Sequence, residues 1–465
     1  MSKKADISEV LDRFLTEKKY GCYRNCIYEN VGTHWRILKL DEVQRSFRRN
    51  LTESENRVVT SGQINEVERR IITDYRFELK EQEVEHPMKL HVQNGVIDLE
   101  TGELISNSKE QFLYQLNFSY VGDKTVEKDS YLRKFLATSL NNQKKEQLLL
   151  ETVGYIISEI TDAHVAIFYY GESGTGKSMI LNLVKKVIGD ENTTAITFDD
   201  IGSRFNKACL AGSKINICSE MQGGKFKNEG IFKAIVSNER IMAEHKGENP
   251  FEFQVKTKLL TAGNVFPEFS VGAGMEAILR RIVVVRFTTK IPVKDINLEK
   301  KLWEERDVMF SLAVNALIEL IRREYEFTKT EDSEVFFQTM RRDATALDDF
   351  IESECIRGGQ AQVHLVKLIE RFEQFQTENG YDVRISTREL SQKIASLEGV
   401  TREKFRMHGK ALWGFKGIRL MEKNCYKNSS NASGVGRSSS LIEGKESSCA
   451  TQDSQENYKF KVEIN

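Results

Sequence analysis

One short segment constrains the fold of this chain more than any other. A strand-like apolar run, 165–170, leads into it, and a helical pattern over 179–188 follows and stops at Gly189. Between them, eight residues fit the phosphate-binding pattern G-x-x-x-x-G-K-[ST] at every constrained position: Gly171, Glu172, Ser173, Gly174, Thr175, Gly176, Lys177 and Ser178. This order of strand, glycine-rich loop and helix predicts an α/β fold built around the loop.

The residue types in the loop match the chemistry of a nucleotide phosphate. Glycines let the backbone curl so that successive N–H groups point at phosphate oxygens. We expect Lys177 to reach the β- and γ-phosphates and the Ser178 hydroxyl to bind Mg²⁺. The predicted cofactors are therefore ATP and Mg²⁺. A purely structural glycine turn is the alternative, but such a turn has no need of the Lys-Ser pair.

The net charge and the lack of long apolar runs limit the partners that this protein can have. The net charge of the 465 residues is −1, so any contact with nucleic acid must come from local basic surfaces. No apolar run reaches the roughly 18 residues needed to span a bilayer, and the first residues lack the apolar core of a signal peptide. We expect a cytoplasmic protein with no membrane partner.

Periodicity divides the chain into four parts. The predicted parts are an α+β N-terminal accessory domain (1–130), a P-loop ATPase domain (131–330), a C-terminal domain of helices and a hairpin (340–423) and a disordered tail (424–465). Within the ATPase domain, apolar strands alternate with helices, which predicts a parallel sheet. The expected strands are 165–170, 194–198, 214–219, 256–261 and 282–287.

Polar residues at the ends of these strands are candidate catalytic groups. Glu220 ends an apolar strand, where it would polarise the attacking water or complete the Mg²⁺ shell. Asn264 follows another strand and would contact the γ-phosphate. Arg281, with Arg280 as second choice, precedes the last strand and would enter a neighbouring subunit's nucleotide site. The alternatives are a solvated glutamate at a strand end, a turn residue at Asn264 and a pair of solvated arginines.

The order and compactness of these motifs resemble those of the superfamily 3 helicases. In detail the chain is similar to the phage/plasmid primase–helicase family, which is related to the poxvirus primase-helicase. The segments that carry the resemblance are 90–102, 198–205, 210–214, 232–235, 245–251, 262–267 and 280–287. The resemblance spans about residues 20–420. It implies an AAA+-type motor that hydrolyses ATP, forms a hexameric ring of identical subunits and moves along DNA.

Three departures from the family pattern bear on activity. Ser219 stands where the family often has a second acidic residue, 237–239 reads Ser-Asn-Glu instead of Gly-Gly-Asp, and 271–275 lacks an aspartate. Residues 1–85 lack the clustered acidic motif of a primase domain, so a primase would be a separate partner.

Two basic features are candidate DNA contacts. His245 and Lys246 lie between two strand-like runs and resemble the family's pore hairpin, which would grip single-stranded DNA. Residues 384–419 carry nine Lys or Arg against three acidic residues. Arg384 and Arg388 lie beside a helix start there, and the segment resembles the family's C-terminal winged-helix domain, which would bind duplex origin DNA. A packing domain with a solvated basic face is the alternative.

Together these features predict an ATP-dependent DNA helicase that initiates or drives replication of a phage, plasmid or integrated mobile element. The alternative is an ATP-regulated origin-binding or scaffold protein without unwinding activity. Ser219 and the altered Asn238-Glu239 pair favour that alternative.

Overall fold

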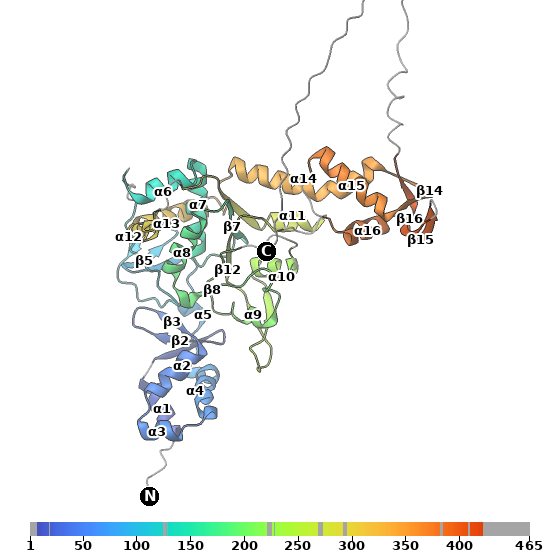
Figure 1. Cartoon of the computed structure of the whole chain (residues 1–465). Coiled ribbons are helices and arrows are strands. Elements are labelled where there is room, and N and C mark those ends of the chain that lie inside the picture. Colours follow the sequence, from blue (N-terminus) through green and yellow to red (C-terminus); the bar gives the residue numbers. More distant parts are fainter. Residues whose placement is uncertain are drawn as a thin grey trace, which may run out of the picture.

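The computed structural model describes residues 7–17, 19–123, 127, 129–220, 226, 228–267, 273–291, 295–381, 385–407 and 410–421. The predicted tail, 424–465, lies outside these residues. Figure 1 shows an N-terminal unit below a central α/β body, with a C-terminal unit that projects sideways from the body. Among the described residues, no helix has the length and apolar character that crossing a membrane requires.

The N-terminal unit packs four helices on a small sheet. The helices are α1 (Ile7–Glu17), α2 (Leu40–Arg49), α3 (Glu53–Val58) and α4 (Ser61–Thr73). The antiparallel strands are β1 (Tyr20–Tyr23), β2 (Cys26–Asn30) and β3 (Trp35–Leu38). Arg24 and Asn25 form the first turn with φ of 51° and 61°, as a two-residue hairpin requires. Apolar side chains such as Phe14, Phe47 and Val67 fill the core between these helices and strands.

A second antiparallel sheet follows the helix α5 (Glu81–Val84) and packs on the central body. Its strands are β4 (Lys89–Val92), β5 (Gly95–Asp98) and β6 (Leu104–Ile105). Val92 pairs with Gly95, so Gln93 and Asn94 form the two-residue turn between β4 and β5. Leu90 and Ile97 are fully buried in the same core as the helices of the body. The sheet thereby joins the N-terminal part of the chain to the body.

The body is built on a five-stranded parallel sheet in the order β13-β7-β12-β9-β8. This confirms the predicted α/β architecture with a parallel sheet. The strands are β7 (Ala166–Gly171), β8 (Thr193–Thr194), β9 (Ile215–Cys218), β12 (Lys258–Gly263) and β13 (Ile282–Phe287).

One strand is much shorter than predicted. We expected a strand over 194–198, but β8 ends at Thr194. The side chain of Asn216 accepts a hydrogen bond from the Ile196 N–H (2.7 Å) and donates one to the Ile196 carbonyl (2.9 Å). This amide takes the place of a backbone partner, so the ladder stops and Phe198 turns into the core.

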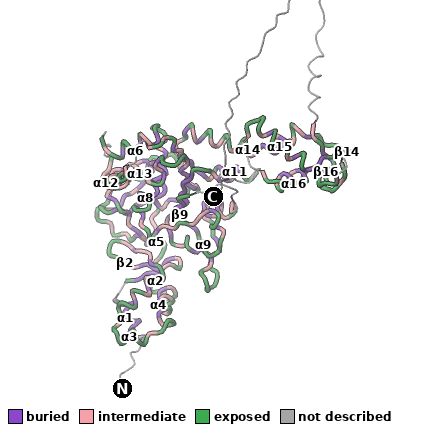
Figure 2. Tube along the Cα trace, in the orientation of Figure 1, coloured by how far each residue is buried: buried purple, intermediate pink, exposed green. Residues whose placement is uncertain are grey.

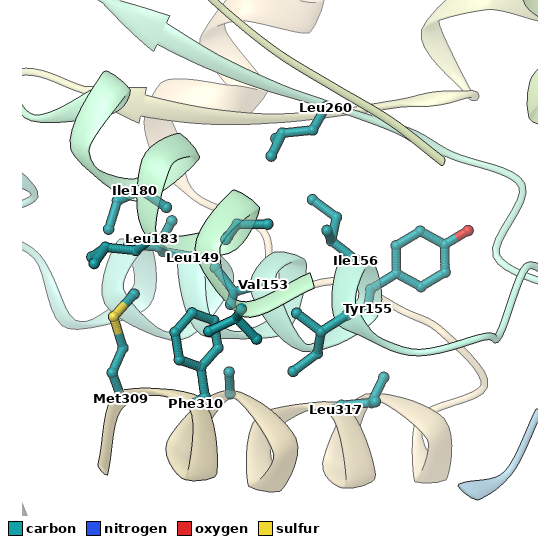
Figure 3. Packing of buried hydrophobic residues seen from close by; sticks show 14 of the residues in the cluster. Leu149, Val153, Tyr155, Ile156, Ile180, Leu183, Leu260, Met309, Phe310 and Leu317 are labelled. Carbon is teal, nitrogen blue, oxygen red and sulfur yellow. The ribbon is translucent and has the colours of Figure 1, made fainter. Parts of the chain in front are cut away.

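Helices cover one face of the sheet and form its main core. They are α6 (Tyr131–Ser139), α7 (Gln143–Ile157), α8 (Lys177–Ile188), α12 (Leu298–Glu304) and α13 (Arg306–Arg322). Figure 3 shows Leu149, Val153 and Ile156 of α7 between α13 and the strand that carries Leu260. Burial is concentrated in this body, whereas the outer faces of the helices are exposed (Figure 2).

Two long helical stretches of the sequence are each broken in two. Residues 131–160 break near Asn141, which has a φ of 47°, and Asn142 caps α7 through its side-chain oxygen. Residues 298–324 break at Glu305, whose carboxylate accepts hydrogen bonds from the N–H groups of Tyr131 (2.9 Å) and Leu132 (2.7 Å). The break therefore supplies an anion to the N-terminus of α6.

The other face of the sheet carries shorter elements. These are α9 (Arg204–Ala208), α10 (Glu229–Val236), the hairpin of β10 (Arg240–Ala243) and β11 (Phe251–Gln254), and α11 (Ala273–Leu279). Phe198, Phe226 and Phe232 contact one another edge to face at the centre of this layer.

The C-terminal unit has one strand more than predicted. Its order is α14 (Glu331–Glu354), β14 (Cys355–His364), α15 (Leu365–Asn379), α16 (Thr387–Ala395), β15 (Thr401–Met407) and β16 (Lys410–Leu420). The sheet order is β14-β16-β15. Our expectation of three helices and a hairpin omitted β14, because residues 356–361 are largely exposed and show no alternating pattern. Pairing with the distant β16 makes this segment a strand.

The contact between α7 and α13 is close enough to exclude a side chain at Gly154. A Cβ at this position would overlap the backbone carbonyl oxygen of Ala313. We predict that Gly154→Ala lowers the free energy of unfolding by about 1–3 kcal/mol, because the helices must move apart. The control is Gly230→Ala, which meets no atom within 4 Å in α10 and should be neutral or stabilising by up to about 1 kcal/mol. Thermal unfolding of both variants checks this, and an equal response would contradict the close contact.

Candidate active site

The glycine-rich loop of residues 171–178, predicted to bind phosphate, lies between β7 and α8 at the carboxyl edge of the parallel sheet. Gly171, Gly174 and Gly176 have φ of 153°, 80° and 98°, which side chains rarely adopt. A Cβ at Gly176 would lie 2.7 Å from the ring of Phe135 on α6, and one at Gly171 would overlap the carbonyl oxygen of Phe287. The glycines are therefore needed both for backbone conformation and for close packing.

Lys177, the first residue of α8, is buried and lies at the centre of the loop. Its Nζ donates hydrogen bonds to the carbonyl oxygens of Gly171 and Glu172, both at 2.6 Å, and to Asn264 Oδ1 at 3.0 Å. Burial lowers the pKa of Lys177 from its usual value. An ammonium group held in this way is positioned by the loop itself and is close to any group that the loop binds.

The structure brings the other predicted residues of this edge to the same cleft. Asn264 follows β12, and Glu220 follows β9, two strands away from the loop. Both side chains are exposed, as is Ser178. The cleft is lined by Ser173, Gly174, Thr175, Gly176, Lys177, Ser178, Met179, Ser219, Glu220, Gly263, Asn264, Val265, Ile291, Asp295 and Leu298.

Three of the lining residues come from a segment that no sequence motif covers. Ile291, Asp295 and Leu298 follow β13, and the Ile291 N–H donates to the Gly174 carbonyl at 3.0 Å. The pKa of Asp295 is lowered by its hydrogen bonds with Lys301 (2.8 Å) and the Asn297 N–H (2.9 Å). This segment carries no sequence motif, because it reaches the cleft only through the pairing of β13 with β7.

Arg281 lies at the opposite edge of the sheet from the loop. Its carbonyl accepts from the N–H of Ala166, at the start of β7, whereas the loop follows the end of that strand. Its guanidinium donates to the Ala277 carbonyl (2.7 Å) and Ser237 Oγ (3.2 Å), and burial lowers its pKa. Arg280, in contrast, is exposed. Neither arginine reaches the cleft of its own chain.

The candidate DNA contacts lie on other elements. His245 and Lys246 are exposed in the loop between β10 and β11, and the His245 ring stacks on Phe251 with centroids 5.1 Å apart. Arg388 is exposed on α16, whose N-terminus is capped by Ser386. Arg384 lies outside the described residues.

Comparison with known proteins gives two family matches. Residues 10–152 match the family described as D5 N terminal like. Residues 169–281, which contain most of the cleft, match a family of unknown function, DUF5906. The first match supports the resemblance to primase–helicase-like replication proteins over the N-terminal part of the chain.

Solved structures of the C-terminal region of NrS-1 are similar to this chain. An apo structure in the A form is 12% identical, with 88% of this chain and 98% of that chain covered and a TM-score of 0.46. A second apo structure, of residues 305–718, is 13% identical, with 89% and 100% covered and a TM-score of 0.42.

We predict that Lys177→Ala weakens the binding of ATP by roughly 100-fold or more, because a charged hydrogen-bond donor to phosphate is lost. Lys185→Ala is the matched control, since Lys185 lies on the same helix but pairs with Asp190 at 2.9 Å on the surface. Titration with a fluorescent ATP analogue measures both affinities. Equal affinities for the two variants would show that the loop does not bind the nucleotide.

Proposed function

We propose that this chain is an ATP-dependent DNA helicase, an ATP hydrolase with an AAA+-type P-loop fold, that initiates or drives replication of a phage, plasmid or integrated mobile element. The observation that carries the proposal is the convergence of Lys177, Asn264 and Glu220 on one cleft at the carboxyl edge of the parallel sheet. A phosphate-binding loop joined to a carboxylate and an amide across the sheet is what ATP hydrolysis requires.

Each side chain of the cleft has a role in this reaction. Lys177 binds the β- and γ-phosphates, and Asn264 holds Lys177 and contacts the γ-phosphate. Glu220 accepts the proton of the attacking water as general base. The exposed oxygens of Ser178 and Glu220 suit Mg²⁺, which would neutralise charge on the phosphate oxygens. The apolar side chains of Met179, Ile291 and Leu298 offer a surface for the base.

A ring of subunits completes the proposed site. The arginines at the opposite edge are distant from their own cleft, so they act only on a neighbour in a head-to-tail assembly. We propose a hexameric ring in which an arginine of one subunit stabilises the charge of the γ-phosphate in the next. Arg281 is the residue that the resemblance favours, but Arg280 has the exposed side chain.

DNA contacts are proposed for two parts of the ring. His245 and Lys246, at the tip of the β10–β11 hairpin, would hold the phosphates of single-stranded DNA in the pore. The C-terminal unit has the order helix, strand, helix, helix and two strands, which favours a winged-helix domain. Its helix α16, with Arg388, would enter the major groove of duplex origin DNA. A separate primase would supply the primers.

A strand-displacement assay on a forked duplex tests the proposal. The wild-type protein should separate the strands when ATP and Mg²⁺ are present. Glu220→Gln should bind ATP normally but hydrolyse it roughly 10²- to 10⁴-fold more slowly, because the base is lost while Lys177 is kept. Glu304→Gln, exposed at the end of α12, is a control for charge and should unwind normally. ATP hydrolysis without strand displacement would favour the origin-binding or scaffold alternative.

Mixing experiments test the shared site. Arg280→Ala and Arg281→Ala are each compared with Lys177→Ala, and the variant that loses the arginine finger should bind ATP but hydrolyse it roughly 10³- to 10⁵-fold more slowly. Mixed with Lys177→Ala, it should regain part of the activity, because some interfaces then pair an intact loop with an intact arginine. If neither arginine variant recovers activity in mixed rings whose co-assembly is demonstrated, the site is not shared.

A further inference from the structure

The hairpin of β15 and β16 has two faces that differ sharply in charge. Lys404 lies directly opposite Trp413, and Arg406 lies opposite Ala411. Because residues opposite each other in an antiparallel pair share a face, and alternate residues of a strand do too, Arg402, Lys404 and Arg406 lie on the face of Trp413. This face, which we call the tryptophan face, carries three cations and no acidic side chain from β15.

The tryptophan face is open to solvent around Trp413, whereas Phe415, opposite Arg402 on the same face, is buried in the core. Trp413 is 52% exposed, and the side chains of Arg402, Lys404 and Arg406 are exposed as well. The guanidinium carbon of Arg402 lies 5.1 Å from the centroid of the Trp413 ring, which holds one side of the indole in place. In the described part of the chain, none of the three cations has a carboxylate within ion-pair distance.

The opposite face of the same hairpin is neutralised and packed. Lys416 pairs with Glu403 at 2.7 Å, and Phe405 packs on the His364 ring with centroids 4.9 Å apart. All three cations of β15 therefore lie unpaired on the tryptophan face. An exposed tryptophan among unpaired cations is not expected on a surface that contacts only solvent, as in a domain that serves only for packing.

We propose that the tryptophan face binds unpaired DNA, with a base stacked on Trp413 and the flanking phosphates on Lys404 and Arg406. The DNA partner rests on the proposed function, but the single-stranded site does not belong to α16 or to the pore hairpin. An aromatic ring offers its plane to a base only when that base is unstacked, whereas paired bases present edges. Three cations beside the ring supply the complementary charge for the backbone.

The location of the hairpin suits the binding of forked DNA, in which duplex and unpaired strands meet. It shares a hydrophobic core with α16, since Leu390 of that helix and Phe415 of β16 are buried in the same cluster. Figure 1 shows β15 and β16 at the end of the C-terminal unit that is distant from the parallel sheet, with α16 between them and the body. A duplex held by α16 would thus have an adjacent surface for one strand where the pairing ends.

Intrinsic fluorescence of the full chain tests the proposal directly, because Trp413 is itself the reporter. The other tryptophans are Trp35, which is buried, and Trp303, which is partly buried and is replaced by Phe to isolate the signal. Oligo(dT) should quench the fluorescence, and a duplex of equal length should not. Quenching by the duplex alone, or by anionic vesicles and not by oligo(dT), would overturn the proposal. DNA that binds only at other sites of the protein would leave the fluorescence of Trp413 unchanged.

Affinity measurements by anisotropy with labelled oligo(dT) give the second readout. Trp413→Ala should weaken binding about 5- to 100-fold, and Trp413→Phe should retain part of the affinity, because a base still stacks on the smaller ring. Lys404→Ala should lower the salt slope of the affinity by about 0.7. Lys416→Ala, on the opposite face, is the matched control and should leave the slope unchanged.

Strand displacement by the same variants separates this proposal from the proposed function. If the wild-type protein unwinds a fork but Trp413→Ala binds oligo(dT) with wild-type affinity, the tryptophan face is not a DNA site and the helicase assignment stands. If oligo(dT) quenches Trp413 and the wild-type protein does not unwind, the helicase assignment fails and the single-stranded site stands.

Discussion

The parallel register of the central sheet is the constraint on which the rest of the structure depends. Gly263 of β12 pairs with Tyr170 of β7, and Thr261 pairs with Cys218 of β9, so the three strands end within a few residues of one another. This register brings the loop after β7, Asn264 after β12 and Glu220 after β9 to one edge. A shift of β12 by two residues would move Asn264 by about 7 Å and break its 3.0 Å contact with Lys177. The proposed chemistry therefore depends on strand pairing as well as on the side chains themselves.

The amino edge of the same sheet has a different role. Lys258, the first residue of β12, is buried and donates to the carbonyls of Tyr155 and Ser158, which end α7. Burial lowers the pKa of Lys258 well below its usual value, and its Nζ lies 4.2 Å from the centroid of the Tyr155 ring. Arg281 lies at this edge too, bound to its own chain. Among the described residues, no side chain of the amino edge lines the cleft, so the arginine finger proposed above would have to come from a second subunit.

The sequence predicted the features that are local in the chain, and it missed those that depend on distant partners. The strands β7 and β13, the order of strand, loop and helix around residues 171–178 and the end of α8 at Gly189 follow from short patterns in the sequence, and they are confirmed. The early end of β8 depends on the side chain of Asn216, and the strand β14 depends on its pairing with β16. The break at Glu305 depends on the contact of its carboxylate with the N-terminus of α6. The roles of Lys177, Glu220, Asn264 and the arginines remain predictions, although the first three share a cleft.

A structure of the assembled protein with a non-hydrolysable ATP analogue, Mg²⁺ and forked DNA tests the central claim most directly. The account predicts a ring in which the γ-phosphate contacts Lys177 and Asn264 of one subunit and an arginine, 280 or 281, of the next. It also predicts one DNA strand in the pore, beside the β10–β11 hairpins. A nucleotide bound away from the carboxyl edge of the sheet, or DNA bound only to the outside of a subunit that lacks a ring partner, would contradict it.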